Sequence, residues 1–195
     1  MNLPNKLTVF RMILIPVFML VLALPLDWGT LQVAGAVLPV THLVAAIIFI
    51  VASLTDLADG KIARKYKLVT NFGKFADPLA DKLLVMTALI FFVQFGWVPA
   101  WIVAIIVIRE LAITGLRTLI VENNGKVLAA AMPGKIKTAS QMVAISFFLL
   151  HDIVFAMFNI PFAMIMIWIA LLATTTQELI ISTRTVKFSL TGSSN

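Results

Sequence analysis

A run without a single charged residue extends from Leu83 to Ile108. A membrane-spanning helix needs about 20 predominantly apolar residues, so this run is too long for one helix. Gly96, Trp97 and Pro99 interrupt it near its middle, and glycine and proline are the residues that most often end a helix. The run therefore predicts two apolar helices joined by a tight turn.

The composition agrees with this interpretation. Of the 195 residues, 61% are hydrophobic and 12% are charged, whereas soluble domains average roughly 45–50% apolar and about 25% charged residues. The apolar runs are long and unbroken, which favours helices over the short alternating segments of a membrane barrel. The chain contains no cysteine, which excludes disulfides, thiolate metal sites and a cysteine nucleophile.

We therefore expect an all-α integral membrane protein with six transmembrane helices. A short interfacial segment over residues 2–11 leads into the first of them. The expected spans are 7–26, 40–63, 78–95, 99–120, 134–151 and 160–183. They form a single membrane-embedded domain over residues 1–185, and residues 186–195 form a flexible tail.

The charges predict the orientation of these helices. All fifteen lysines and arginines lie at the termini, in or near the 2–3 and 4–5 connections, or in the helix halves leading into them. The other connections carry only Asp27 and Asp152. Because cytoplasmic loops are rich in basic residues, both termini are expected in the cytoplasm. The net charge of +6 then indicates contact with anionic headgroups and not with nucleic acid.

Four of the nine acidic residues lie close together around the second and third spans. Asp56 and Asp59 are three residues apart, and Asp77 and Asp81 are four apart, so each pair shares one helix face. A hairpin between the two spans brings the four carboxylates together, where they repel one another. Oxygen ligands suit Mg²⁺, Mn²⁺ or Ca²⁺, and two such ions can clamp a transferring phosphoryl group. The alternative is solvated carboxylates balanced by neighbouring basic residues.

A second group of residues is basic and predicts an anion site. Arg109 lies inside the fourth span, where a guanidinium needs a partner. The adjacent Glu110 points about 100° away around the helix and is therefore expected to be a poor partner. An ion pair with a buried aspartate is the structural alternative for Arg109. Arg117 lies eight residues further along on the same face, so the two arginines can clamp a phosphate.

Other polar residues extend this predicted anion site. Lys135 and Lys137 begin the fifth span nearby, although either could be an ordinary cytoplasmic anchor. Thr8 and Arg11 of the first span could line the same pocket, with a lipid-headgroup anchor as the alternative for Arg11.

The pattern Asp-x2-Asp-Gly-x2-Ala-Arg-x8-Gly-x3-Asp-x3-Asp resembles the signature of the CDP-alcohol phosphotransferases. It is carried by Asp56, Asp59, Gly60, Ala63, Arg64, Gly73, Asp77 and Asp81. Residues 2–11, 109–117 and 134–138 are similar to segments of bacterial family members that use glycerol 3-phosphate as the acceptor.

The resemblance implies transfer of a phosphatidyl group from CDP-diacylglycerol to sn-glycerol 3-phosphate, giving phosphatidylglycerol phosphate and CMP. It implies a homodimer in a bacterial cytoplasmic membrane, with the active site facing the cytoplasm. Two divalent ions, Mg²⁺ or Mn²⁺, would be held by Asp56, Asp59, Asp77 and Asp81. Asp81 would also be the general base. Asp59, Gly60, Ala63 and Arg64 would bind the CDP moiety. Arg109, Arg117, Lys135 and Lys137 would bind the acceptor phosphate.

Two other functions remain open at this stage. A sister enzyme could use inositol phosphate, serine or phosphatidylglycerol, and the cationic residues favour a phosphorylated acceptor. A transporter could also carry intramembrane charges, but these would be spread along several helices and not gathered at one membrane face. His42 and His151 are far apart in the sequence, so we expect no histidine pair and no metal role for them.

Overall fold

The computed structural model describes residues 3–33, 36–66, 71–122, 132–156, 158 and 160–176. Within these ranges the description leaves out the side chains of residues 3–4, 57–66, 71–78, 116–122, 132–133, 135, 154 and 156. The expected tail at 186–195 lies outside the described residues.

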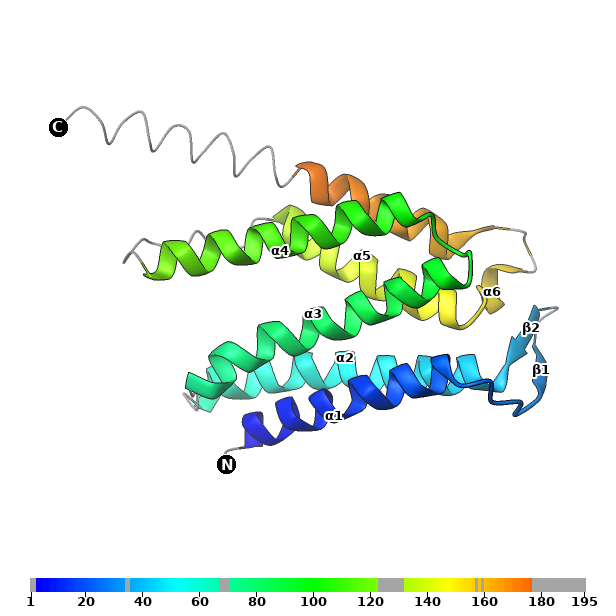
Figure 1. The fold of residues 1–195 in the computed structure, drawn as a ribbon, viewed down its shortest axis with the longest axis horizontal. Coiled ribbons are helices and arrows are strands. Elements are labelled where there is room, and N and C mark those ends of the chain that lie inside the picture. The colour runs from blue at the N-terminus through cyan, green and yellow to red at the C-terminus, as the bar shows by residue number, and fades with distance from the viewer. Residues whose placement is uncertain are drawn as a thin grey trace.

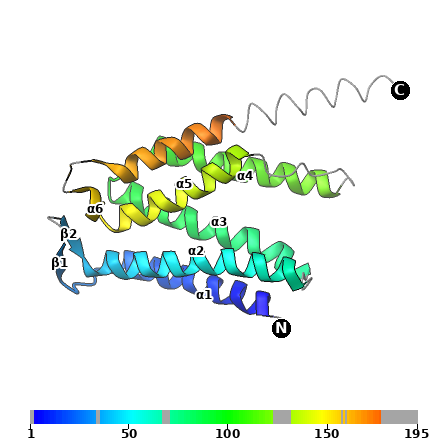
Figure 2. The ribbon, with the colours of Figure 1, turned by 180° about the vertical axis from the view of Figure 1, so that it is seen from behind.

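The fold is a bundle of helices with one small hairpin (Figure 1). The elements are α1 (Leu3–Ala23), β1 (Thr30–Val33), β2 (Ala36–Pro39), α2 (Val40–Tyr66), α3 (Asn71–Gln94), α4 (Ala100–Glu122), α5 (Met132–Leu149), α6 (Ile153–Ala156) and the helix Phe162–Thr176. The mostly helical class predicted from the sequence is confirmed. Successive long helices run in opposite directions, as the views from both sides show (Figures 1 and 2).

Several boundaries differ from the expected ones. Residues 3–11 belong to the continuous helix α1, so the expected lead-in is not a separate element. The second helix runs on to Tyr66, and the third begins at Asn71 instead of near Pro78. Asp77 therefore lies inside α3 and not at its first turn. The turn between α3 and α4 is where it was predicted, with Gly96 at a φ of 73°, a conformation that glycine adopts without strain.

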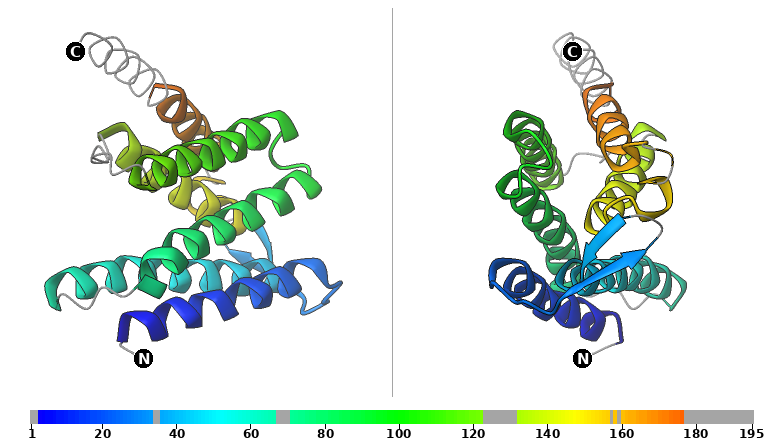
Figure 3. Two further views of the ribbon diagram at one scale, coloured as in Figure 1. Left: turned by 60° about the vertical axis from the view of Figure 1, so that its left-hand side comes forward. Right: turned by 90° about the vertical axis from the view of Figure 1, so that its right-hand side faces the viewer.

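The hairpin between α1 and α2 was not predicted. Its two antiparallel strands pair Thr30 with Pro39 and Val33 with Ala36. Short strands of three or four apolar residues give little periodic signal. This hairpin lies at the end of the bundle opposite the N-terminus (Figures 1 and 3).

Aromatic and aliphatic side chains from α1 to α5 form the core. Phe18 and Phe49 are fully buried with ring centroids 6.2 Å apart, which joins α1 to α2. Phe92 of α3 packs on Phe148 of α5 at 5.1 Å. Alanines on α2, among them Ala45 and Ala52, are fully buried. Small residues at these positions let the neighbouring helices approach closely.

One stretch of α1, Asn5–Ala23, is long and apolar enough to cross a membrane by the criterion of length and composition, applied to the described residues only. Three shorter apolar helices, Val40–Asp56, Ile136–Leu149 and Phe162–Thr176, accompany it. Large apolar side chains also point outward, among them Ile90 and Ile108. Contiguous outward-facing apolar surface of this kind marks a protein or membrane contact.

The hairpin end of the bundle holds a histidine pair. His42 Nδ1 lies 2.7 Å from His151 Nε2, and the two rings stack with Trp97 against their edges. The expectation that neither histidine has a second one nearby was therefore wrong. Sequence separation hides this contact, because only the packing of α2 beside α5 brings position 42 to position 151.

Residues 151 and 152 form a strained corner at the end of α5. His151 and Asp152 have φ angles of 54° and 51°, in the left-handed region that costs non-glycine residues energy. The Asp152 carboxylate accepts a hydrogen bond from the backbone N–H of Ala163 at 3.0 Å. This bond caps the first turn of the helix Phe162–Thr176 and holds the corner.

Burial lowers the pKa of His151, so the folded protein takes up this proton less readily than the unfolded chain. Acidification through the ordinary histidine pKa of about 6.5 therefore reduces the free energy of unfolding. Asp152 acts in the opposite sense, because burial raises its pKa. We expect the melting temperature to fall between about pH 7.5 and pH 5.5, and to fall less in H151N, since asparagine tolerates the left-handed backbone. Equal pH dependence in both proteins would contradict this assignment.

Candidate active site

An ion pair joins α1 to α2. Arg11 Nη1 is 2.6 Å from Asp56 Oδ1. The Arg11 side chain is 0% exposed and that of Asp56 is 28% exposed. A lipid-headgroup anchor must reach the surface, so that alternative for Arg11 was wrong. Thr8, one turn before it, is buried as well.

Asp81 of α3 joins this pair. Its carboxylate interacts electrostatically with Asp56, and with three cations, Arg11, Lys82 and Lys137. Two of the four predicted metal ligands thus lie near each other, from adjacent helices. Two neighbouring carboxylates repel, and a divalent cation with oxygen ligands relieves that repulsion. The donor chemistry of Asp56 and Asp81 therefore fits the predicted cation.

The other signature residues are placed by their backbone only. Asp59, Gly60, Ala63 and Arg64 belong to the last part of α2, and Asp77 belongs to the first part of α3. These parts lie side by side at the same end of the bundle (Figures 1 and 3). Their side chains lie outside the described residues, as do those of Arg117 and Lys135. Within the described part, no three acidic, histidine or cysteine residues gather as a metal site, so the four-aspartate set stays a prediction.

Glu110 pairs with two of the predicted phosphate-binding cations. Its Oε1 lies 3.4 Å from Arg109 Nη1 and forms an ion pair with Lys137 Nζ of α5. All three side chains are largely buried. The expectation that Glu110 is a poor partner of Arg109 was wrong, because two long side chains on adjacent positions bend toward each other. Glu110 is therefore the partner that the buried Arg109 guanidinium requires.

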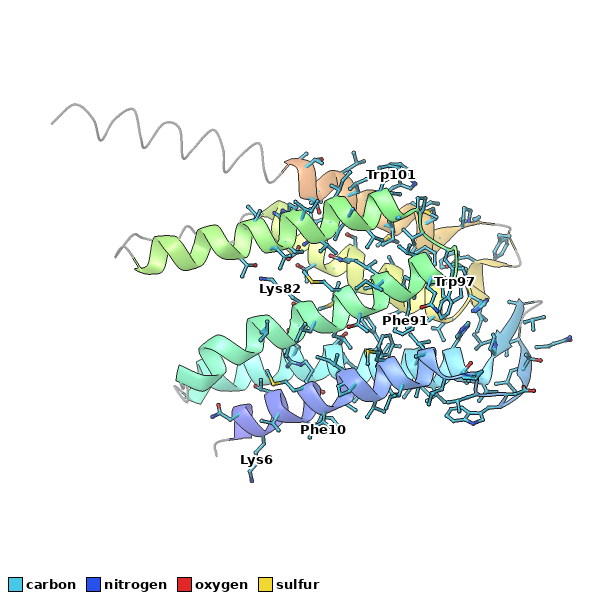
Figure 4. The ribbon with its side chains drawn as sticks, in the orientation of Figure 1. Lys6, Phe10, Lys82, Phe91, Trp97 and Trp101 are labelled. Carbon is cyan, nitrogen blue, oxygen red and sulfur yellow. The ribbon has the colours of Figure 1, made fainter. Side chains whose placement is uncertain are left out.

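A lysine bridge links α3 to α4 next to this group. Lys82 donates a hydrogen bond to the hydroxyl of Thr114, and Figure 4 shows its side chain in the space between the two helices. Thr114 in turn donates to the backbone carbonyl of Glu110 at 2.7 Å. Sequence reasoning missed Lys82, Glu110 and Thr114. Lys82 could have been found from its position next to Asp81. Thr114 could have been found from its spacing of four residues from Glu110.

Several of these groups line one cavity between α3, α4 and α5, whereas Arg109 and Thr114 are not part of its lining. Its polar wall consists of Asp81, Lys82, Glu110, Lys137, Thr138 and Gln141, and its apolar wall of Val85, Met86, Leu89, Ile106 and Met142. Gln141 was also missed. It is 3% exposed, and its Nε2 donates to no other described residue. A buried donor without a partner is costly, and a bound polar molecule can supply one.

The cavity therefore combines a carboxylate with fixed cations in a low-dielectric setting. A carboxylate can accept a proton from a hydroxyl group. Lys82 and Lys137 of the lining can bind a phosphate, and Arg109, which pairs with Glu110 of the lining, offers a planar pair of donors beside them. This combination suits the transfer of a phosphoryl group to a phosphorylated alcohol.

Comparison with known proteins decides the family. The model of the CDP-alcohol phosphatidyltransferase family matches residues 1–176. The chain belongs to this family. Its similarity to curated members extends over most of its length. It is 54% identical over 173 residues to the CDP-diacylglycerol–glycerol-3-phosphate 3-phosphatidyltransferase of Bacillus subtilis, covering 89% of each chain.

Two further relatives are more distant. The Escherichia coli K12 protein of the same name is 38% identical over 151 residues, which cover 76% of each chain. A probable phosphatidylglycerophosphate synthase of Mycobacterium tuberculosis is 40% identical over 149 residues, covering 76% of this chain and 66% of that protein. The resemblance predicted from the aspartate signature is confirmed.

In this CDP-alcohol phosphatidyltransferase, the Arg11–Asp56 pair is expected to stabilise the fold. In R11M the Asp56 carboxylate loses its buried partner, which typically costs several kcal/mol. Because Asp56 keeps some exposure, we expect a fall of about 5 °C in the melting temperature. Thermal unfolding of the purified protein in detergent measures it. K6M is the matched control, since Lys6 lies on the same helix but is exposed and points away from the bundle (Figure 4). A melting temperature of R11M equal to that of K6M would contradict the assignment.

Proposed function

We propose that this chain transfers the phosphatidyl group of CDP-diacylglycerol to sn-glycerol 3-phosphate, giving phosphatidylglycerol phosphate and CMP. The observation that carries the proposal is the cavity, where Asp81 lies within electrostatic reach of Lys137. The names of the B. subtilis and E. coli relatives describe the same reaction.

The acceptor enters with its phosphate toward the cations. Arg109 and Lys137 bind the phosphate, joined by Arg117 and Lys135, which lie on the same two helices. Thr8 and Arg11 of α1, predicted to line the same pocket, are fully buried and absent from the cavity lining, so Arg11 acts on the site through Asp56. Binding of the phosphate holds the 1-hydroxyl of the acceptor near Asp81. This positioning supplies a large share of the rate enhancement, because it removes the entropy cost of bringing the reactants together.

Asp81 then accepts the proton of the 1-hydroxyl. The hydroxyl oxygen attacks the phosphorus that carries the diacylglycerol. The bond from that phosphorus to the CMP oxygen breaks, and CMP leaves with the electron pair. Atoms and charge balance, because the proton stays on Asp81 until solvent removes it.

Asp56, Asp59, Asp77 and Asp81 would hold two divalent ions, Mg²⁺ or Mn²⁺. When bound, such ions neutralise the diphosphate oxygens and the developing charge on CMP. Asp59, Gly60, Ala63 and Arg64 of α2 would bind the CDP moiety, the small residues leaving room for the cytidine and Arg64 supporting the diphosphate.

The lipid substrate and the outward-facing apolar side chains support a bacterial cytoplasmic membrane as the location. The proposed arrangement is one domain over residues 1–185 with six membrane-spanning helices. The positive-inside rule supports cytoplasmic placement of both termini and of the α2–α3 end that carries the aspartates. The homodimer implied by the resemblance is part of the same proposal.

A sister enzyme with another acceptor is the competing function. Arg109 and Lys137 favour a phosphorylated acceptor over serine, and the named relatives favour glycerol 3-phosphate over inositol phosphate. A transporter is disfavoured, because the paired charges described here form one cluster around Asp81 and Glu110 instead of a path through the bundle.

The test measures CMP release by the purified protein in detergent. CDP-diacylglycerol is supplied with Mg²⁺ or Mn²⁺, and the acceptor is glycerol 3-phosphate, inositol phosphate, serine or none. We expect release only with glycerol 3-phosphate and metal. In D81N we expect a loss of at least about a hundredfold, as general bases contribute 10²–10⁴-fold. D152N is the control, because Asp152 caps a helix at the opposite end of the bundle. Release with a different acceptor would overturn the acceptor assignment, and no release at all would overturn the reaction.

A further inference from the structure

The acceptor cavity already contains an anion that belongs to the protein. The Glu110 carboxylate lies between Arg109 and Lys137, with its Oε1 on both. Its side chain is 16% exposed and lines the cavity. Arg109 and Lys137 are 5% and 4% exposed. The two cations that suit a phosphate are thus bound by a carboxylate of the protein itself.

A carboxylate and a phosphate compete for the same donors. Each presents anionic oxygens to guanidinium and ammonium groups. Binding of both anions to the same two cations is unfavourable, because the carboxylate and the phosphate would then lie close together and repel each other in a low-dielectric cavity. A phosphate that binds Arg109 and Lys137 must therefore replace Glu110 at one or both of them.

We propose that Glu110 is an exchangeable counter-ion of the acceptor site. It neutralises Arg109 and Lys137 while the site is empty, gives way to the acceptor phosphate, and returns when the product leaves. This inference rests on the proposed function, and it adds a residue that controls how tightly the acceptor and the product are held.

The charges of acceptor and product explain why such a residue helps. A phosphate monoester carries nearly two negative charges at neutral pH, so it outcompetes a single carboxylate. The product keeps the same phosphate monoester, since only the 1-hydroxyl of the acceptor reacts. Two bare buried cations would hold that product tightly. The returning carboxylate lowers the affinity for both molecules and so speeds product release.

The surrounding contacts hold the backbone at Glu110 in place. Thr114 donates to the Glu110 backbone carbonyl at 2.7 Å, and Lys82 bonds to the same hydroxyl. These bonds hold the helix at Glu110 against α3. The exchange therefore involves the Glu110 side chain and not its backbone.

The test uses E110Q, which keeps the shape of the side chain and removes its charge. Binding of inorganic phosphate to the purified full-length protein, without CDP-diacylglycerol, is measured by calorimetry. We expect binding on the order of tenfold tighter than in the unmodified protein, because no charge-assisted bond to Glu110 has to break. The KM for glycerol 3-phosphate is expected to fall by a similar factor, and kcat to fall with it, since release of product slows.

D27N is the matched control. Asp27 is exposed and bonds to the backbone of Gly29 near the hairpin, so this variant removes one negative charge away from the cavity. Its phosphate affinity and kinetics are expected to equal those of the unmodified protein. E110A removes the same carboxylate and replaces E110Q if the latter does not fold.

Unchanged or weaker phosphate binding in the folded Glu110 variant would overturn the inference, because Glu110 would then only support Arg109 and Lys137. A raised KM with unchanged kcat would overturn it for the same reason. The failure of the proposed function looks different, since CMP release would not depend on glycerol 3-phosphate while phosphate still bound more tightly to E110Q.

Discussion

Charges buried in an apolar bundle need partners, and this requirement organises one end of the molecule. Arg11 is fully buried and pairs with Asp56. Arg109 and Lys137 share Glu110. An isolated ion in such a place costs several kcal/mol, so the Arg11–Asp56 pair holds α1 to α2 and the Lys137–Glu110 pair holds α5 to α4. The helix contacts that close the bundle and the contacts that build the cavity are at this end the same contacts.

This arrangement explains how a small chain can place a reactive carboxylate accurately. Asp81 lies on α3, and the hydrogen bond from the adjacent Lys82 to Thr114 links this helix to α4. Its partners come from α1, α2 and α5. Sites built on helices are positioned more precisely than sites on loops. In phosphoryl transfer, where positioning and charge compensation dominate, such rigidity serves catalysis directly.

The contacts at the hairpin end of the bundle differ in kind from those around the cavity. At the hairpin end, His42, His151 and Trp97 form a stacked cluster, and Asp152 caps a helix. These contacts are short-range and mostly aromatic, and they fix the corner where α5 ends. The opposite end carries the cavity and the ion pairs. Stability is not confined to the hairpin end, because the Arg11–Asp56 pair is expected to stabilise the fold as well.

Much of this protein follows from local patterns along the chain. Apolar runs about as long as a bilayer is thick predict the helices, because every backbone polar group must be satisfied within them. The spacing of the aspartates predicts carboxylates on shared helix faces, and the signature of eight fixed positions resembles that of the family, which the comparison confirms. Tertiary structure alone decided which distant charges meet. The pairing of Arg11 with Asp56, of Lys137 with Glu110, and of His42 with His151 depends on helix packing and side-chain bending. These three pairings could not be predicted from sequence periodicity, because the spacing of residues along one helix does not depend on contacts with remote segments.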